Sequence, residues 1–185
     1  MYTGRPNGDR NPARERPGTR HNNAYESGTS SEFSTCYHPS WGRHKSRTRP
    51  AVGNHDYLTS GASGYFGYFD PVVQTSYYSY ELGAWHVVVL NSNCSQAGGC
   101  GAGSPQEKWL RADLAAHPTA CTLAYWHHPR FSFGQYSNDT RMQALWQALD
   151  AAGAEIVLAG HDHNYQRYAP QTPTGARDDA RGIRQ

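Results

Sequence analysis

The chain of 185 residues lacks any long apolar run, and this absence limits the kind of protein it can be. No stretch approaches the roughly 18 apolar residues of a membrane-spanning helix. Met1 is followed by polar and Arg-rich residues instead of the apolar centre of a signal peptide. The sequence therefore predicts no membrane span, and no signal peptide is visible in it.

Charge of one sign is also scarce, since the net charge is +2. Residues 1–23 carry five Arg against one Asp and one Glu, a balance of +3, which leaves about −1 for the rest. A nucleic-acid surface needs a broad basic face, so no nucleic-acid partner is expected. Residues 1–23 are rich in Gly, Pro, Asn and Arg and are predicted to form a disordered tail. A basic arm that binds nucleic acid is the alternative for this tail.

Cysteines are few, and none of the four stands in a C-x-x-C pair, which argues against a structural zinc site. Cys94 and Cys100 bracket Ser-Gln-Ala-Gly-Gly, a loop flexible enough to close as a disulfide. Four free thiols in a cytosolic protein are the alternative. A disulfide would indicate an exported protein, so the full-length parent is expected to be secreted or periplasmic.

The second half of the chain predicts alternating strands and helices. The expected strands are Trp85–Asn91, Cys121–Trp126 and Glu155–Ala159. One helix should start with a Ser104–Glu107 capping box and run to about Ala116, with Trp109, Leu110 and Leu114 facing inward. A second, capped by Asp139 and ended by Gly153, should bury four apolar side chains: Met142, Leu145, Trp146 and Leu149. This order predicts an α/β sheet with a parallel part.

The first half is less regular. Residues 58–80 are rich in Gly and Tyr and are predicted to form loops and short strands. Ala51-Val52 gives a weak indication of a short strand.

Three short motifs carry the chemistry, and each follows an expected strand: Gly53-Asn54-His55-Asp56, Trp126-His127-His128-Pro129 and Gly160-His161-Asp162-His163. Ligands of open α/β sheets bind beyond the carboxyl ends of strands, so the three motifs can converge. Imidazoles and an amide carbonyl suit zinc, iron or manganese. In extended backbone His161 and His163 would point to the same side and address one metal cluster. A hydrogen-bonded structural role is the alternative for any single one of these histidines.

The stretches GNHDY, YWHHPRFS and GHDHNYQR resemble the calcineurin-like metallophosphoesterase superfamily, and most closely its purple-acid-phosphatase-like branch. The likeness covers roughly residues 24–185. It implies a metallophosphoesterase-type sandwich of two mixed sheets flanked by helices, two bound metal ions and hydrolysis of small-molecule phosphate esters. The resemblance implies that a metal-bound hydroxide attacks phosphorus in line, while both metals stabilise the developing charge.

Carried over by motif, the resemblance implies that Asn54, His127 and His161 hold one metal and His163 belongs to the other. His55 matches a histidine that orients phosphate or protonates the leaving alkoxide. His128 is expected to be a pocket residue at most. The three charged residues of these motifs are expected to brace loops: Asp56, Asp162 and Arg167.

The pattern departs from the family near its start. Tyr25 fits the family's metal-ligating tyrosine, but Asn22 stands where an aspartate bridges both metals. Two dications about 3.5 Å apart repel strongly, and a neutral amide offsets this far less than a carboxylate does. Residues 1–23 also lack the family's first Asp-x-His motif, and Gln185 follows soon after the third motif. We therefore expect a partial catalytic domain over residues 24–185, with two divalent or mixed-valence ions (Fe, Zn or Mn) or only one retained. The alternative is a degenerate domain that binds one metal or phosphate without turnover.

Overall fold

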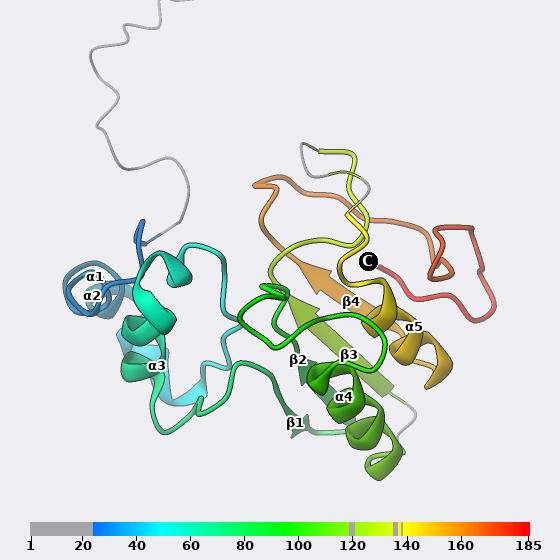
Figure 1. Cartoon of the computed structure of the whole chain (residues 1–185), viewed down its shortest axis with the longest axis horizontal. Coiled ribbons are helices and arrows are strands. Elements are labelled where there is room, and N and C mark those ends of the chain that lie inside the picture. Colours follow the sequence, from blue (N-terminus) through cyan, green and yellow to red (C-terminus); the bar gives the residue numbers. More distant parts are fainter. Residues whose placement is uncertain (1–23, 119–120, 135–136, 138) are drawn as a thin grey trace, which may run out of the picture.

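The structure, a computed structural model, describes residues 24–118, 121–134, 137 and 139–185. Figure 1 shows two regions side by side. The first region, residues 24–77, holds α1–α3, and the second, residues 78–185, holds the sheet with α4 and α5. Asn22 and the tail predicted over residues 1–23 lie outside the described residues.

One mixed four-stranded sheet organises the second region, in the order β1-β2-β3-β4. The strands are β1 (Tyr78–Leu82), β2 (Trp85–Val89), β3 (Cys121–Trp126) and β4 (Ile156–Ala159). β1 is antiparallel to β2, whereas β2, β3 and β4 are parallel. The α/β class and the parallel part are confirmed, and within the described residues the strands form this one sheet.

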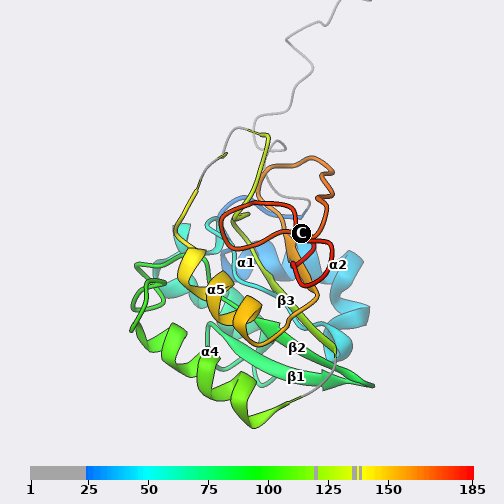
Figure 2. The same cartoon turned by 90° about the vertical axis from the view of Figure 1, so that its right-hand side faces the viewer.

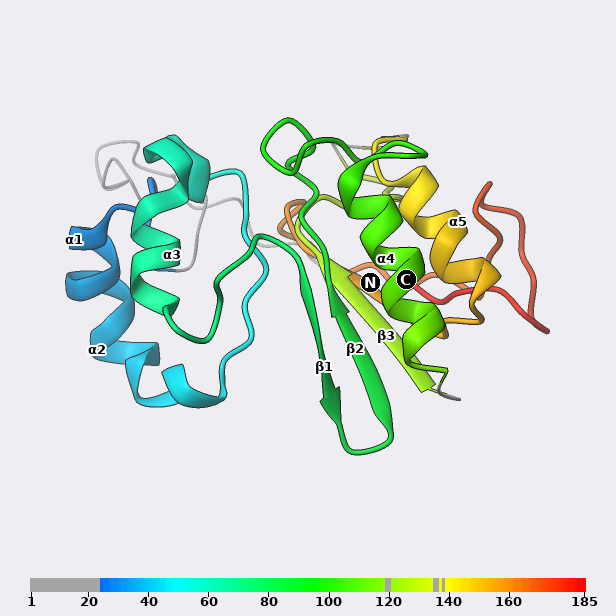
Figure 3. The ribbon, with the colours of Figure 1, turned by 60° about the horizontal axis from the view of Figure 1, so that its bottom comes forward.

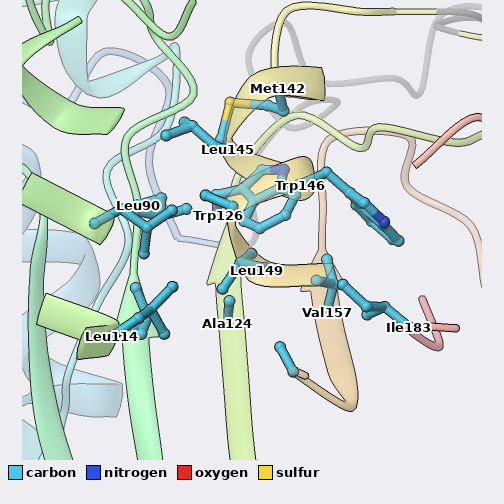
Figure 4. Close-up of a cluster of buried hydrophobic side chains, with 14 of the residues drawn as sticks. Leu90, Leu114, Ala124, Trp126, Met142, Leu145, Trp146, Leu149, Val157 and Ile183 are labelled. Atoms are coloured by element: carbon cyan, nitrogen blue, oxygen red, sulfur yellow. The ribbon is translucent and has the colours of Figure 1, made fainter. Parts of the chain in front are cut away.

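Two helices, α4 (Pro105–Ala116) and α5 (Gln143–Ala151), cover one face of the sheet, as Figures 2 and 3 show from two sides. Both helices turn an apolar stripe toward the strands, and Figure 4 shows the resulting core. Trp146, Leu145 and Leu149 of α5 are fully buried there. They pack with Leu110 and Leu114 of α4 and with side chains of the strands beneath: Val88, Ala124, Trp126 and Val157.

The ends of these helices match their sequence signals in part. Ser104 caps α4 by accepting from the Glu107 N–H, but Glu107 reaches back to the Gly103 N–H at 3.0 Å and not to Ser104. Gly153 ends α5 with φ 78°, and the N–H groups of Gly153 and Ala154 donate to carbonyls of the last turn. This arrangement is a Schellman motif, which satisfies carbonyls at a helix end.

The predicted cap at Asp139 is wrong. α5 begins at Gln143 after Met142, with no side-chain cap. Asp139 Oδ1 instead accepts from the Arg141 N–H at 2.9 Å and so stabilises the turn before the helix.

The first region corrects two expectations. Residues 63–69 form a helix, α3 (Ser63–Phe69), where loops and short strands were predicted, although β1 does supply a strand. Ala51-Val52 belongs to no strand. The remaining α-helices are α1 (Ser30–Glu32) and α2 (His38–Trp41), linked by a π-helical stretch and followed by a 3₁₀ segment to Arg47. Two short 3₁₀ helices, Asp56–Leu58 and Ser60–Ala62, precede α3.

Aromatic packing explains why α3 forms from the Gly- and aromatic-rich sequence SGYFGYF. Phe33, Tyr65 and Phe69 are buried together, with ring centroids 5.3–6.5 Å apart. Gly64 lets α3 approach the segment before α1, because a Cβ there would lie 2.1 Å from the Gly28 carbonyl oxygen. Tertiary contacts therefore outweigh a helix propensity that two glycines weaken.

Polar side chains join the two regions. From the sheet, the Tyr78 hydroxyl donates to the Pro50 carbonyl oxygen at 2.8 Å, and the Tyr125 hydroxyl donates to the Arg49 carbonyl oxygen. Tyr65 of the first region donates to the same Pro50 oxygen at 2.9 Å. Asn93 Nδ2 donates to the Val52 carbonyl oxygen at 3.3 Å. Residues 49–53, which lead into Asn54, are thereby held against the sheet.

Two further features bear on the expectations from sequence. Cys94 and Cys100 form the predicted disulfide, while Cys36 and Cys121 are thiols outside it. Among the described helices, none combines the length and apolarity needed to cross a membrane.

Candidate metal centre

The three motifs meet at the carboxyl ends of the parallel strands. His127 follows β3 directly, and His161 lies two residues beyond β4. The Gly160 N–H donates to the His127 carbonyl oxygen at 3.0 Å and so ties the two segments together. Asn54 reaches the same point from the first region, although no strand precedes it.

Asn54, His127 and His161 place three ligand-type atoms in contact. His127 Nε2 lies 2.7 Å from Asn54 Oδ1 and 3.0 Å from His161 Nδ1. Bonds of about 2.1 Å at tetrahedral or octahedral angles separate ligand atoms by about 3.0–3.4 Å. One positive centre among the three atoms, a proton or a metal ion, therefore satisfies both contacts.

The loop that presents Asn54 is stabilised by Asp56. Its Oδ2 accepts from the Gly53 N–H at 2.8 Å, and its Oδ1 accepts from the Tyr25 hydroxyl at 2.9 Å. The absence of a side chain at Gly53 matters, because a Cβ there would lie 3.1 Å from His127 Nδ1. Asp56 thus has the bracing contacts expected of it. Through its hydroxyl, Tyr25 contacts the loop that carries Asn54.

His128 is closer to the centre than a pocket residue was expected to be. One nitrogen of its ring lies within 4.8 Å of ligand atoms of His127 and His161. Ser92 makes two contacts with His128. Its Oγ lies 2.8 Å from the ring atom Nδ1 and accepts from the backbone N–H at 2.9 Å. Ser92 was not expected from the sequence, and His128 was expected to be a pocket residue at most; the tandem His-His pair is the sequence signal that could have indicated its closer position.

The extended backbone expected for His161 and His163 is wrong. Both have positive φ, 72° and 48°, so the segment is a tight turn in which the i, i+2 rule does not apply. His161 joins the centre, whereas His163 is exposed and lies outside the group of His127, His128 and His161. Asp162 accepts from the Ser132 hydroxyl, a contact that braces this turn as expected.

Burial keeps these imidazoles neutral. It lowers the pKa of His127 to about 3, and the neighbouring histidines His128, His161, His55 and His163 lower it further. The pKa of His128 also falls to about 3, through burial and then through His161 and Arg141. Burial lowers the pKa of His161 as well. Neutral imidazole is the form that binds metal, so the electrostatics of the centre favour ligation over protonation.

His55 is anchored beside this group. Its Nδ1 donates to the Glu26 carbonyl oxygen, which leaves Nε2 as the nitrogen with a lone pair in the neutral ring. His55 is also close enough to lower the pKa of both His127 and His161. The other four histidines of the three motifs therefore all lower the pKa of His127.

The fold is an α/β sheet, and neutral histidines and one amide oxygen converge at the carboxyl edge of its parallel strands. Such an arrangement is typical of the metal-dependent hydrolases as a class. Comparison with known proteins narrows the class. The calcineurin-like phosphoesterase family matches residues 18–165. The chain therefore belongs to the calcineurin-like phosphoesterase family, in its purple-acid-phosphatase-like branch.

Individual relatives agree with this placement. The chain is 31% identical over 97 residues to purple acid phosphatase 18 of Arabidopsis thaliana, which covers 49% of this chain and 21% of that protein. It is 27% identical over 146 residues to an uncharacterized protein of Mycobacterium tuberculosis, a match that covers 65% of this chain and 28% of that protein. The solved structure of a purple acid phosphatase from yellow lupin seeds shares the fold, with a TM-score of 0.54 and 16% identity. The match covers 70% of this chain and 25% of that one. The chain thus spans about a quarter of the length of these relatives.

Proposed function

We propose that this protein hydrolyses phosphate esters with the help of metal ions bound at the Asn54–His127–His161 centre. The observation that carries the proposal is the convergence of Asn54 Oδ1, His127 Nε2 and His161 Nδ1 within hydrogen-bond distance of one another. Membership of the calcineurin-like phosphoesterase family supports the type of reaction.

The donor set fits a borderline transition metal. Two neutral imidazoles and an amide oxygen suit iron, zinc or manganese better than calcium or magnesium, which prefer oxygen ligands. Asn54, His127 and His161 would hold this ion, and His128 offers a further nitrogen. When bound, such an ion lowers the pKa of a coordinated water and withdraws electron density from a phosphoryl oxygen.

The chain's own residues would orient the ester. His55 lies beside the centre and is held through Nδ1 by the Glu26 carbonyl oxygen, so in its imidazolium form the second N–H, on Nε2, would donate to a phosphoryl oxygen or protonate the leaving alkoxide. Ser92 orients the His128 ring, and Asp56 sets the position of Asn54 through Gly53. A cavity lined by Pro129, Gly160 and Asp162 lies next to the second and third motifs and gives the remainder of a small ester a place to bind.

A second metal would use His163, with Tyr25 and Asn22 as the remaining candidates. His163 lies close enough to affect the pKa of His127, yet it is exposed, and the Tyr25 hydroxyl is bonded to Asp56. With Asn22 in place of a bridging carboxylate, we propose that this second position is the weaker one. An Asn22→Asp substitution should raise its occupancy.

The competing function is a degenerate domain that binds one metal or phosphate without turnover. Asn22 is the feature that favours it, because the amide offsets little of the repulsion between two cations. The Cys94–Cys100 disulfide supports a secreted or periplasmic location, since disulfides persist in oxidising compartments.

Metal content and activity, measured together, test the proposal. The purified chain and its His161→Ala variant are dialysed against metal-free buffer, and their metal is counted by elemental analysis. Hydrolysis of a chromogenic phosphomonoester and a phosphodiester is then measured with Mn²⁺ or Zn²⁺ added. A His44→Ala variant, which alters a histidine remote from the centre, is the control.

We expect His161→Ala to lose metal and at least 100-fold of the hydrolysis rate, while His44→Ala matches the wild type. A wild-type chain that loses metal on His161→Ala but shows no hydrolysis of either ester would establish the degenerate domain instead. A folded chain whose metal content is unaffected by His161→Ala would refute the site assignment.

A further inference from the structure

A second group of histidine and carboxylate side chains lies at the opposite end of the sheet. It consists of His86 in β2, Asp113 in α4 and His117 at the end of α4, and one ligand atom of each lies within 4.8 Å of the others. The sheet register pairs His86 with Thr122, five residues before His127. At about 3.3 Å per residue, the two groups are separated by about 16 Å along the strand.

We propose that His86, Asp113 and His117 form a second, independent metal site, fitted to Zn²⁺. His86 is almost fully buried, and its Nε2 lies 2.7 Å from Asp113 Oδ2. His117 supplies a second imidazole from a half-exposed position, with its side chain 45% accessible. Two imidazoles, one carboxylate and an open fourth position are a common zinc ligand set.

The hydrogen bonds of both histidines leave the correct nitrogen for a metal. His86 Nδ1 lies 2.7 Å from Glu81 Oε1, and an ionised carboxylate only accepts, so Nδ1 carries a proton; a metal ion would take the place of the proton that Nε2 shares with Asp113 Oδ2. His117 Nδ1 lies 2.8 Å from the Asp113 carbonyl oxygen, which also only accepts. In the neutral form of each ring, the lone pair is therefore on Nε2.

Partners of this kind are typical of metal sites. Zinc-bound histidines usually donate their other N–H to a carboxylate or a backbone carbonyl, which fixes the tautomer and the ring orientation. Ligating carboxylates are in turn hydrogen-bonded, and the Ser79 hydroxyl donates to Asp113 Oδ1 at 2.7 Å. Glu81, Ser79 and the α4 backbone thus provide each of the three ligands with an orienting partner.

The charge of the site attracts a cation. His86 Nε2 and Asp113 Oδ2 lie 2.7 Å apart, so a positive centre lies between them: a proton in the metal-free protein, which a bound cation would replace. The carbonyls at the C-terminal end of α4, a helix of 12 residues, add a favourable field for a cation at His117. Glu81 contributes a further negative charge.

Admitting the ion requires a small opening and one ring rotation. Tetrahedral zinc would separate the His86 and Asp113 ligand atoms by about 3.3 Å, an opening of about 0.6 Å from the present contact. The His86 and His117 rings are stacked, with centroids 4.6 Å apart and planes at 13°. His117 must therefore turn to bring its Nε2 toward the ion, and its exposure leaves room for that turn.

Zinc stoichiometry in the full chain tests this site. Wild type, His117→Ala, Glu81→Gln, His161→Ala and the control His44→Ala are equilibrated with buffered Zn²⁺, and bound zinc is counted by elemental analysis. Substitution of the half-exposed His117 and Glu81 avoids cutting into the core at His86. Phosphoesterase activity and circular dichroism are recorded for each variant.

We expect His117→Ala to bind one zinc fewer than wild type and Glu81→Gln to bind that zinc about 10-fold more weakly. Both should keep hydrolysis within twofold of wild type, while His161→Ala should retain the zinc that His117→Ala loses. Equal zinc content in wild type and His117→Ala would overturn the proposal and leave His86 as a protonated bridge between two carboxylates. Since that result would not touch the effect of His161→Ala on activity, the two proposals can fail separately.

Discussion

The two regions of this molecule are built on different kinds of core. Residues 78–185 pack aliphatic and tryptophan side chains from regular strands and helices, whereas residues 24–77 pack tyrosine and phenylalanine rings from short helices and turns. Each region contributes part of the candidate metal centre. His127 and His161 come from residues 78–185, and Asn54 comes from residues 24–77. The positions of the ligand atoms relative to one another therefore depend on how firmly residues 24–77 are attached to the sheet.

The largest expected effect comes from truncating each core. Trp146 and Phe33 are 0% and 1% exposed, and replacing either with Ala should cost about 3–5 kcal/mol of unfolding free energy. We expect Trp146→Ala to weaken the whole chain. Phe33→Ala should release residues 24–77 while the amides of β2 and β3 stay protected.

Urea unfolding and hydrogen exchange would measure this difference. Phe133→Ala is the control, because Phe133 is 90% exposed and its loss should cost less than about 0.5 kcal/mol. If Phe33→Ala exposed β3 as much as Trp146→Ala does, the two regions would be one cooperative unit.

Metal binding should join the two regions, since its proposed ligands come from both. At a concentration 100 times its dissociation constant, Mn²⁺ should stabilise the folded chain by about 2.7 kcal/mol, and a chelator should reverse this. Thermal unfolding measures the gain, and hydrogen exchange at residues 49–58 shows whether the first region shares it. In Asn54→Ala that local protection should disappear; its persistence would mean that Asn54 is not a ligand.

A smaller effect is expected at the contact between the regions. Tyr125→Phe removes the hydroxyl that donates to the Arg49 carbonyl oxygen, and a polar group left without a partner costs about 1–3 kcal/mol. We expect lower stability in urea and a higher metal requirement, because Asn54 follows this segment. Tyr165→Phe is the matched control, since Tyr165 is 88% exposed. Equal behaviour of the two variants would show that this hydrogen bond does not attach the first region.

The smallest effect concerns the start of the first region under acid. Burial alone would raise the pKa of Glu32, but hydrogen bonds from Thr29, Glu26 and Ser27 outweigh it and lower the pKa. The folded pKa thus lies below the unfolded one, so Glu32 stabilises the fold above the unfolded pKa of about 4.5, and this stability is lost as pH falls through the folded pKa.

Glu32→Gln should remove that pH dependence and cost less than about 1 kcal/mol at neutral pH. Unfolding curves between pH 3 and 7, compared with those of Glu26→Gln, would measure it. A steeper acid dependence in Glu32→Gln than in wild type would reverse the assigned sign.

Much of the second region could be predicted because its signals are local. The apolar run at Trp85, the capping serine at 104 and the glycine at 153 each report on a few neighbouring residues, and the observed elements agree within one or two residues, except for the start of α5. The cap assigned to Asp139 was wrong because a turn competed for its carboxylate.

The first region could not be predicted in the same way. α3 exists because its rings pack against Phe33, some 30 residues away, and no periodic pattern in residues 58–80 records that contact. Asn54 was assigned to the centre by its motif alone, since the segment before it is not the expected strand but a stretch held by tyrosine hydroxyls from the sheet side.

The sequence by itself determined the α/β class, the three motifs and the identity of His127 and His161 as candidate ligands, because strand and helix periodicity and motif order are local properties of the chain. Only the tertiary structure decided that His128 and Ser92 join the centre and that His163 stands apart on a tight turn. The tertiary structure also brought His86, Asp113 and His117 together at the far end of the sheet. These outcomes depend on contacts between residues distant in sequence and on backbone angles set by those contacts, which local patterns do not encode.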